Sequence, residues 1–514
     1  DIGTDLTDRV DVDLRLRGEG PPLTATYRDG YAGNGRANIR NFTANLSSTA
    51  TWNVTSSISF KTTAGLQYVD FKQDGNTATG TTLPIGAQTA NAGATLGASE
   101  STTLRRTLGM YVEESAAIND RLFITAAVRS DQNSAFGTEF QNVMYPKLQG
   151  SWIISDERWF HAPRWLDNLR LRLAYGAAGV QPGSNDALRT FAATTPNIQG
   201  VDVPAVVYST PGNVALKPEF TDEYETGFEA RLWKGRASLD LTYYSKRTKD
   251  ALISAIVAPS AGASTTVRMN LGAVANSGVE MLLTGQLIDT RNFGLDVTIN
   301  AAYNENKLLS LGGTPPQIGT QTRVLENYPL FGLWARQITG WEDKNNDKIL
   351  TYSSNPTANE VFVDSVATFM GYSAPHQSIA LTTGMDLFNR RVRVTALLDY
   401  RGGNRYYNNT ERIRCVSRQN CEGLMNPDAS FEDQAMAVAT LNDPSQTIAG
   451  FFQPGAFVKL REVAATYNLT QAQASRFKMR NASVTLSARN LWKWTKYRGV
   501  DPESDYTVTD GTDN

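Results

Sequence analysis

Few residues of the sequence could do chemistry. The 514 residues include two histidines, His161 and His376, which lie far apart in the sequence and have no obvious partners. Histidine is the usual general base and a common zinc ligand, so histidine-centred catalysis and zinc binding have little support. The G-x-S-x-G turn that carries the nucleophile of serine hydrolases is also missing from the sequence. We therefore predict that the protein is not an enzyme.

One short run has the spacing of a calcium loop. Asp343, Asn345 and Asp347 form a D-x-N-x-D pattern, which places three oxygen ligands on one side of a tight turn. Calcium loops have Gly at the sixth position and Glu at the twelfth, where this sequence has Lys348 and Ser354. The run therefore predicts either a structural calcium site or a solvated turn, and no other cofactor is expected.

The two cysteines, Cys415 and Cys421, are close together in a polar segment. No second C-x-x-C pair or Cys/His cluster accompanies them, so a metal site of that kind is not indicated. The spacing favours a local disulfide, formed in an oxidising compartment, over two free thiols.

The overall charge and hydropathy exclude two classes of protein. The formal net charge is -2 and there is no basic block, so a nucleic-acid partner is not expected. No stretch approaches the roughly 18 consecutive apolar residues of a membrane-spanning helix. A helical membrane protein is therefore not predicted.

The dominant pattern is alternation of apolar and polar residues with a period of two, which is typical of strands with one apolar face. From Leu169 to Gly176, for example, leucines and Tyr175 alternate with Arg170, Arg172, Ala174 and Gly176. Soluble sandwiches share this pattern. Many of the runs exceed ten residues, however, whereas strands of soluble domains have about 5–6 and about 9–11 tilted residues cross a bilayer. The lengths favour a membrane barrel.

The connections between these runs alternate between tight and long, as in outer-membrane barrels with short periplasmic turns and long extracellular loops. Tight turns are expected at Asn119-Asp120, Lys234-Gly235 and Asn389-Arg390. The expected long excursions are Lys72 to Thr103, Asp131 to Asn142, Gly179 to Lys217, Lys249 to Ala263, Lys307 to His376 and Gly402 to Ala456. The predicted fold is thus all-β, an up-and-down transmembrane antiparallel barrel.

Counting alternate directions gives about fifteen strands over residues 1–514. The strand-like run Leu330 to Trp341 would break the alternation as a wall strand, so we place it inside the long excursion. A barrel in lipid leaves no open edge, and the last segment, Tyr506 to Asn514, is polar. We expect the barrel to be incomplete, with an N-terminal plug and a final strand absent from this sequence.

Several segments resemble the SusC/RagA branch of the TonB-dependent receptors. The resemblance covers most of the chain from about Leu104 and is specific only in combination. The matching residues are Tyr145, Pro146, Trp152, Ile154, Leu169 to Gly176, Leu216 to Glu219, Glu223, Glu225, Gly227, Phe228, Leu239, Asp240, Thr242 to Tyr244, Asn270, Gly272, Asn276, Gly278 to Glu280, Asn490, Leu491, Trp494, Tyr497, Gly499 and Asp501 to Glu503.

The resemblance implies a barrel of about 22 strands with a plug, in the outer membrane of a diderm bacterium. It further implies import of nutrients too large for porins, such as glycans, oligosaccharides or peptides. The implied partners are outer-membrane lipids, a SusD-like lipoprotein lid, and TonB, which would act through the missing N-terminal region. A structural or partner-docking barrel without active transport is the alternative from a different class.

Two groups of residues are candidates for contact with a solute. Charged residues on the polar strand faces could guide it along a lumen, or could only solvate the lumen or hold a plug; these are Arg170, Arg172, Glu229, Arg231, Asp240 and Arg393. Loop aromatics could stack on sugars or pack within the loops; these are Tyr406, Tyr407, Phe451 and Phe452. The substrate-binding residues themselves are not predicted.

Overall fold

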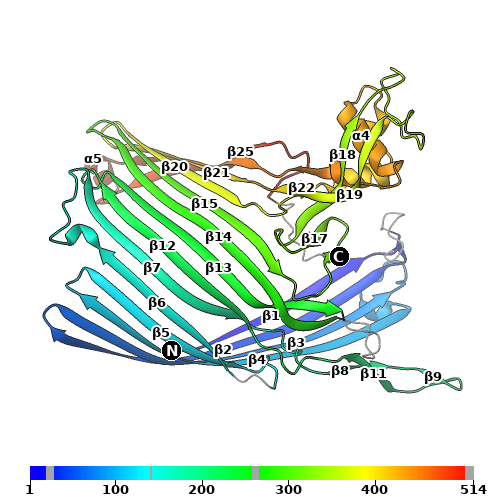
Figure 1. The fold of residues 1–514 in the computed structure, drawn as a ribbon, viewed down its shortest axis with the longest axis horizontal. Helices are drawn as coiled ribbons and strands as arrows, with labels where there is room; N and C mark the ends of the chain where they lie inside the picture. The colour runs from blue at the N-terminus through cyan, green and yellow to red at the C-terminus, as the bar shows by residue number, and fades with distance from the viewer. Residues whose placement is uncertain (19–27, 139–141, 257–265, 504–514) are drawn as a thin grey trace. The chain divides into compact units, whose positions relative to one another are not determined.

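The computed structural model describes residues 1–18, 28–138, 142–256 and 266–503. Its main feature is a fifteen-stranded antiparallel sheet whose strands follow one another in chain order (Figure 1). The strands are β1 (Ile2–Arg15), β2 (Tyr31–Thr55), β3 (Ile58–Thr81), β4 (Thr95–Ile118), β5 (Leu122–Asn133), β6 (Val143–Ile153), β7 (Leu166–Val180), β12 (Glu219–Leu232), β13 (Ala237–Ile256), β14 (Thr266–Asp289), β15 (Gly294–Ser310), β20 (Gln377–Leu387), β21 (Val392–Gly402), β24 (Phe457–Asn468) and β25 (Ser483–Thr495). The predicted strand number is confirmed.

Short turns join the strands at one end, because their residues adopt the left-handed conformation that two-residue hairpins need. Asn119 and Asp120 between β4 and β5 have φ values of 52° and 53°. Asn389 and Arg390 between β20 and β21 have φ values of 57° and 62°. In an antiparallel order, the longer connections then fall at the other strand ends, as predicted. The expected excursion Lys249 to Ala263 begins too early, however, because β13 continues to Ile256, and residues 257–263 lie outside the described residues. No helix among the described residues is long and apolar enough to cross a bilayer.

Strands β2, β3 and β4 are longer than the sequence predicts. The expected excursion from Lys72 to Thr103 is wrong, because an unbroken ladder pairs β3 with β4 from Lys72↔Leu104 to Thr81↔Thr95. Only residues 82–94 connect the two strands. The polar composition of this stretch suggests a loop, but backbone ladder bonds do not depend on apolar side chains, and the strands continue beyond their apolar part.

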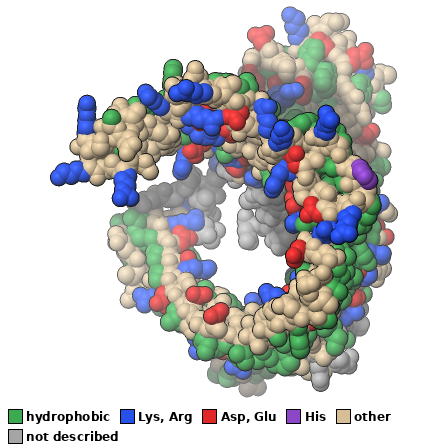
Figure 2. All heavy atoms as spheres, turned by 90° about the vertical axis from the view of Figure 1, so that its left-hand side faces the viewer, with side chains coloured by type: hydrophobic (Ala, Val, Ile, Leu, Met, Phe, Trp, Pro, Cys, Tyr) green, Lys and Arg blue, Asp and Glu red, His purple; other side chains and the backbone are tan. Residues whose placement is uncertain are grey.

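The chain divides into two compact units, each with strands whose faces differ in polarity. Unit 1 contains Asp1–Gly150, Tyr175–Asp222 and Thr248–Leu271, and unit 2 contains Ser151–Ala174, Glu223–Arg247 and Gly272–Asn514. Within unit 1, register places Leu46 opposite Leu66, and Leu66 opposite Met110, on one face. In Figure 2, hydrophobic side chains gather on one face of the strands, and Lys, Arg, Asp and Glu gather on the other.

Unit 2 contains a second small sheet with helices, which we call the loop module. Its sheet is β16 (Gln317–Ile318), β17 (Thr322–Val324), β18 (Gly332–Trp341) and β19 (Val361–Gly371). Its helices are α2 (Asn409–Val416), α3 (Glu422–Met425) and α4 (Phe431–Leu441), followed by η4 (Ala449–Phe451). The expectation that Leu330 to Trp341 lies outside the wall is therefore confirmed. The helices within the Gly402 to Ala456 excursion were not predicted.

The loop module has its own apolar core. One buried cluster joins Leu333, Cys415, Met436 and Phe451 from β18, α2, α4 and η4. A second joins Leu350, Val361 and the other face of α4 at Ala435, Val438 and Ala439. Segments about 100 residues apart in the chain are thus packed into one structure.

The remaining elements are short. Strands β8 (Thr190–Thr194) and β11 (Ala205–Thr210) pair in the excursion after β7, as do β9 (Asn197–Ile198) and β10 (Val201–Asp202). Strands β22 (Arg405–Tyr407) and β23 (Phe452–Pro454) pair beside the loop module. The others are η1 (Ala90–Ala92), η2 (Ile154–Asp156) and α5 (Gln471–Arg476).

Candidate functional site

The polar face of the strands in unit 2 carries linked charges. Arg172 of β7 donates to Glu229 of β12 at 2.9 Å and pairs with Asp240 of β13. The same guanidinium donates to the Thr242 hydroxyl at 3.0 Å. The sequence predicts Arg172, Glu229 and Asp240 on the polar strand faces, and the structure brings these three side chains together. The alternation also places Arg170 and Arg231 on this face.

A second network lies on β15, β20 and β21. Arg393 donates to both carboxylate oxygens of Asp296 at 2.8 and 3.0 Å and to Asp386 at 3.0 Å. Side chains on opposite strands of a ladder are neighbours, and here register aligns Arg393 directly with Asp386. Arg172 and Arg393 therefore each have two carboxylate partners from other strands of the sheet, which neutralise much of their charge.

A third network was missed by the sequence. Arg461 of β24 donates to Glu503 through two parallel bonds of 2.7 Å and to Asp399 at 3.0 Å. Lys459 donates to Asp501 at 3.0 Å and to Glu503 at 2.6 Å. The register shifts between Leu460 and Glu462, and this bulge turns Glu462 to the face that Lys459 and Arg461 already share. Alternation alone predicts Lys459 and Arg461 on one face of β24 and Glu462 on the opposite face. It does not reveal the bulge between Leu460 and Glu462.

A hollow of about 540 Å³ opens on this polar face within unit 2. Its lining includes Arg172, Asp240, Glu280, Asn300 and Arg401. Carboxylates, guanidinium groups and an amide together offer both donors and acceptors, as a polar solute with several hydroxyl or amide groups requires. The site has the chemistry of a binding surface.

The loop aromatics are packing residues. Phe451 is fully buried, and Tyr406 and Phe452 are nearly so. Tyr407 lies against Phe452 with ring centroids 5.5 Å apart, and Tyr406 lies against Tyr497 at 5.4 Å. The interpretation that these residues pack within the loops, and do not stack on a sugar, agrees with their burial.

Asp343, Asn345 and Asp347 form one compact turn at the edge of the loop module. The carboxylate of Asp343 accepts from the backbone N–H of Asp347 at 3.2 Å and of Lys348 at 2.9 Å. Asn345 donates its amide to Asp347 at 2.8 Å. Within the described ranges, no three or more His, Cys, Asp or Glu side chains are grouped to hold a metal. Protein hydrogen bonds support the turn, and calcium binding stays a prediction.

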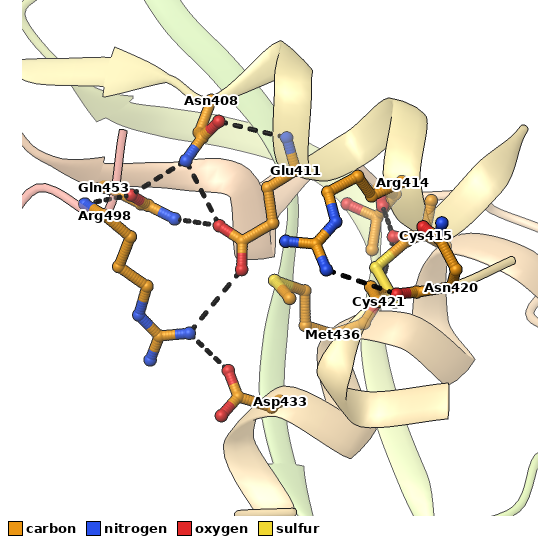
Figure 3. Close-up of a disulfide and its surroundings, with 12 residues drawn as sticks. Asn408, Glu411, Arg414, Cys415, Asn420, Cys421, Asp433, Met436, Gln453 and Arg498 are labelled. Atoms are coloured by element: carbon orange, nitrogen blue, oxygen red, sulfur yellow. Dashed lines mark hydrogen bonds and ion pairs between the residues drawn. A yellow bond between two sulfur atoms is a disulfide. The ribbon is translucent and has the colours of Figure 1, made fainter. Parts of the chain in front are cut away.

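Cys415 and Cys421 form a disulfide, as the sequence favours (Figure 3). Both are buried within the first cluster of the loop module, and Arg414 donates to the carbonyl of Asn420 at 3.3 Å across the closed segment. The bond links the end of α2 to the start of α3. It therefore holds the polar segment Arg418 to Asn420 against the core.

Removal of this disulfide should loosen the loop module locally. The six-residue separation predicts a stabilisation of about 2 kcal/mol from restricted chain entropy. The double change Cys415→Ala and Cys421→Ala should therefore raise the hydrogen-exchange rates of α4 amides about 30-fold, with the fifteen-stranded sheet unaffected. Unchanged exchange in α4 would show that the bond does not contribute to the core.

Arg498 connects the segment after β25 to two helices of the loop module (Figure 3). It pairs with Asp433 of α4 and, at 3.6 Å, with Glu411 of α2. Burial alone would raise the pKa of Asp433, but Arg498 and the hydroxyl of Ser430 hold this pKa below its ordinary value of 3.8. Asp433 is thus kept ionised by its partners.

Glu360 is the second carboxylate that supports the loop module. It is 2% exposed and accepts from the backbone and hydroxyl of Thr351, both at 2.8 Å, and from the backbone of Lys344 at 3.1 Å. Burial would raise its pKa, yet these hydrogen bonds hold the pKa below the ordinary value of 4.5. Glu360 thereby fixes the turn that contains Asp343 to Asp347.

Acid should open the loop module before the main sheet. Asp433 and Glu360 have lowered pKa values in the folded state, so their contribution to stability is complete above the ordinary values and is lost as the pH falls through the folded values. We expect faster limited proteolysis within residues 343–360 and 409–441 below about pH 4. Arg498→Gln removes the main group that lowers the pKa of Asp433, so we expect faster cleavage of residues 409–441 already at pH 7 and a weaker dependence of that cleavage on pH. Equal cleavage at pH 3 and pH 7 would contradict the expectation.

Comparison with known proteins decides the family. Residues 2–491 match the family described as TonB dependent receptor-like, beta-barrel. The chain belongs to this family. Its fold is therefore the transmembrane β-barrel of TonB-dependent receptors, and the protein is an outer-membrane protein of Gram-negative bacteria.

The proteins that are similar to this chain include SusC and RagA proteins, as the sequence motifs predict. TonB-dependent receptor P26 of Formosa agariphila is 25% identical over 437 residues, 77% of this chain and 42% of that protein. TonB-dependent receptor SusC of Bacteroides thetaiotaomicron is 26% identical over 199 residues, 38% of this chain and 20% of SusC. The chain spans less than half the length of these curated relatives.

Solved structures agree on the fold. The structure of the RagAB peptide transporter superimposes with a TM-score of 0.78 at 20% identity, covering 98% of this chain and 57% of that one. The RagAB peptide importer in its open-open state gives a TM-score of 0.77 at 18% identity, covering 98% and 56%. The likeness in fold therefore extends over nearly all of this chain.

Proposed function

We propose that this chain is the barrel component of a TonB-dependent importer that takes up nutrients too large for porins. The observation that carries the proposal is the family match over residues 2–491. The charged strand face and its hollow of about 540 Å³ suit a polar, multiply hydrogen-bonded solute. The proposed function involves no catalysis by this chain.

The proposed substrates are glycans, oligosaccharides or peptides. The peptide alternative is supported by RagAB, which is described as a peptide transporter, and the fold of this chain follows that structure. The proposed partners are TonB, which energises transport, and a SusD-like lipoprotein that covers the outer mouth. A gene for such a lipoprotein beside the receptor gene would support this assembly.

Uptake by living cells tests the proposal. Cells with and without the full-length receptor gene would be given fluorescent oligosaccharides and fluorescent peptides of the same size, with and without a protonophore. We expect receptor-dependent uptake of one class, abolished when the proton gradient that drives TonB is lost. Growth and uptake that are identical in both strains, together with loss of an assembled surface complex in the mutant, would instead favour the structural, partner-docking barrel.

Variants of the polar face connect the result to the structure. Arg172→Gln leaves Glu229 and Asp240 without their shared cation, and we expect it to change the apparent KM for the solute. Arg9→Gln is a matched control, because Arg9 is 62% exposed and pairs only with Asp11 of the same strand among the described residues. Equal uptake by both variants would show that the hollow does not take part in transport.

A further inference from the structure

The apolar face of unit 1 also carries a cluster of cationic side chains, which lies between the apolar part of the strands and the long connections. Register along β2, β3 and β4 places Phe42, Asp70 and Arg106 in one row and Arg40, Lys72 and Leu104 in the next. These residues share the face of Leu46, Leu66 and Met110, since side chains at even spacing along a strand lie on one face. That face is the lipid-facing one in an outer-membrane barrel.

The charged groups of these rows lie toward the long connections. Arg40 and Lys72 are closer than Leu46 and Leu66 to the strand ends at Tyr31 and Thr81, where the long connections begin. Long connections are extracellular in this class of protein, so the cations lie at the outer-leaflet side. The rise of about 3.3 Å per residue puts Asp70 about 13 Å along β3 from Leu66.

Arg40 and Arg106 share one carboxylate, that of Asp70, whereas Lys72 pairs with Asp74 at 2.7 Å. Arg40 and Arg106 each donate to Asp70 at 3.3 Å, one to each carboxylate oxygen. The side chains of Arg40 and Arg106 are 50% and 56% exposed, whereas that of Asp70 is 13% exposed. A guanidinium has five N–H donors, so a single bond to Asp70 leaves donors for an outside oxygen. Asp70 thus holds two half-exposed guanidinium groups on the same strand face.

An apolar hollow of about 610 Å³ lies on the same strands, farther toward the tight turns. Its walls include Leu46, Leu66, Met110 and Val128, and its floor lies at the small residues Ser48 and Ala64. Leu66, in the wall of the hollow, lies about 13 Å along β3 from Asp70, which is within the half-thickness of about 15 Å of a hydrocarbon core. A lipid chain in the hollow would therefore place its headgroup beside Arg40 and Arg106.

We propose that this surface is a binding site for an anionic lipid of the outer leaflet that carries a phosphate monoester. The lipid phosphate accepts from Arg40, Arg106 and Lys72, and an acyl chain fills the hollow between Leu46 and Met110. Charge-assisted bonds to phosphate favour arginine because of its fork of donors. The apolar hollow selects a lipid over a soluble phosphate, and the site is independent of the transported solute.

Native mass spectrometry of the purified full-length receptor in mild detergent tests the site, with monophosphoryl lipid A, phosphatidylcholine and inorganic phosphate as probes. We expect lipid A to bind in preference to phosphatidylcholine. The triple variant Arg40→Gln, Lys72→Gln, Arg106→Gln should bind lipid A about a hundredfold more weakly, at about 1 kcal/mol per cation. Arg105→Gln, next to Arg106 but on the opposite strand face, should bind as the wild type does.

A second variant tests the apolar half independently of the charges. Ala64→Leu fills the floor of the hollow while keeping all three cations, and we expect about tenfold weaker lipid A binding. The site would be refuted by equal binding of phosphatidylcholine and lipid A, or by equal losses in Arg105→Gln and the triple variant. Displacement of lipid A by inorganic phosphate at equal concentration would show an ion site and would also overturn the proposal.

Discussion

Phe451→Ala should lower the free energy of opening of the loop module by about 3–5 kcal/mol, the usual cost of a Phe to Ala change in a core. Phe451 is fully buried in the cluster that joins Leu333, Cys415 and Met436. Its removal leaves a cavity between β18 and three helical segments, which cannot close without moving the disulfide. The loop module should therefore open locally while the fifteen-stranded sheet stays folded.

Hydrogen exchange measures this effect. Amides of α4 should exchange about a thousandfold faster in Phe451→Ala, since 4 kcal/mol corresponds to about three powers of ten. Phe477→Ala is the matched control, because Phe477 is 67% exposed beyond α5 and has the same change in volume. Unchanged exchange in α4, or equal acceleration in both variants, would mean that Phe451 does not hold the loop module together.

Arg461→Ala should destabilise the outer part of β24 by about 2–3 kcal/mol. Its guanidinium is 20% exposed and joins Asp399, 16% exposed, to Glu503. Removing one partner of a fully buried ion pair costs about 3–5 kcal/mol, because the remaining charge has lost its counter-ion. Partial exposure reduces this cost. Glu503 would then lose one of its two cationic partners and keep Lys459, so the part of the segment around Glu503 should loosen.

Two further variants separate charge from geometry. Arg461→Lys keeps the charge but loses the parallel bonds to Glu503, so we expect about half of the effect. Arg489→Ala removes a pair with Glu462 in which Arg489 is 73% exposed, so we expect a change within about 0.5 kcal/mol. Protease cleavage near residues 496–503 is the measurement. Identical cleavage in Arg461→Ala and Arg489→Ala would rule out the network as the anchor of that segment.

The loop module and the anchor after β25 are connected through Arg498. This residue pairs with α4, and five residues later Glu503 pairs with Arg461 on the wall strand β24. Weakening either the contact of Arg498 with α4 or that of Glu503 with Arg461 should therefore weaken the other contact. A double variant Arg461→Ala, Arg498→Gln with a cost different from the sum of the two single costs would measure that coupling.

The sequence by itself determined the strands, their faces and their turns. Alternation with a period of two is a local property, and the left-handed residues of a turn such as Asn119-Asp120 are a local requirement. The fifteen strands and the separate position of Leu330 to Trp341 follow from those two signals. The SusC/RagA motifs then indicated the family.

Only the tertiary structure decided which distant residues meet. Gln434 of α4 accepts from the backbone of Leu350, 84 residues earlier, and no periodicity reports such a contact. The bulge at Arg461 and the continuation of β3 to Thr81 depend on hydrogen bonds to a neighbouring strand, which the sequence of one strand does not contain. Local patterns specify a strand and its faces, whereas the loop module and the charge networks arise from packing between segments far apart in the chain.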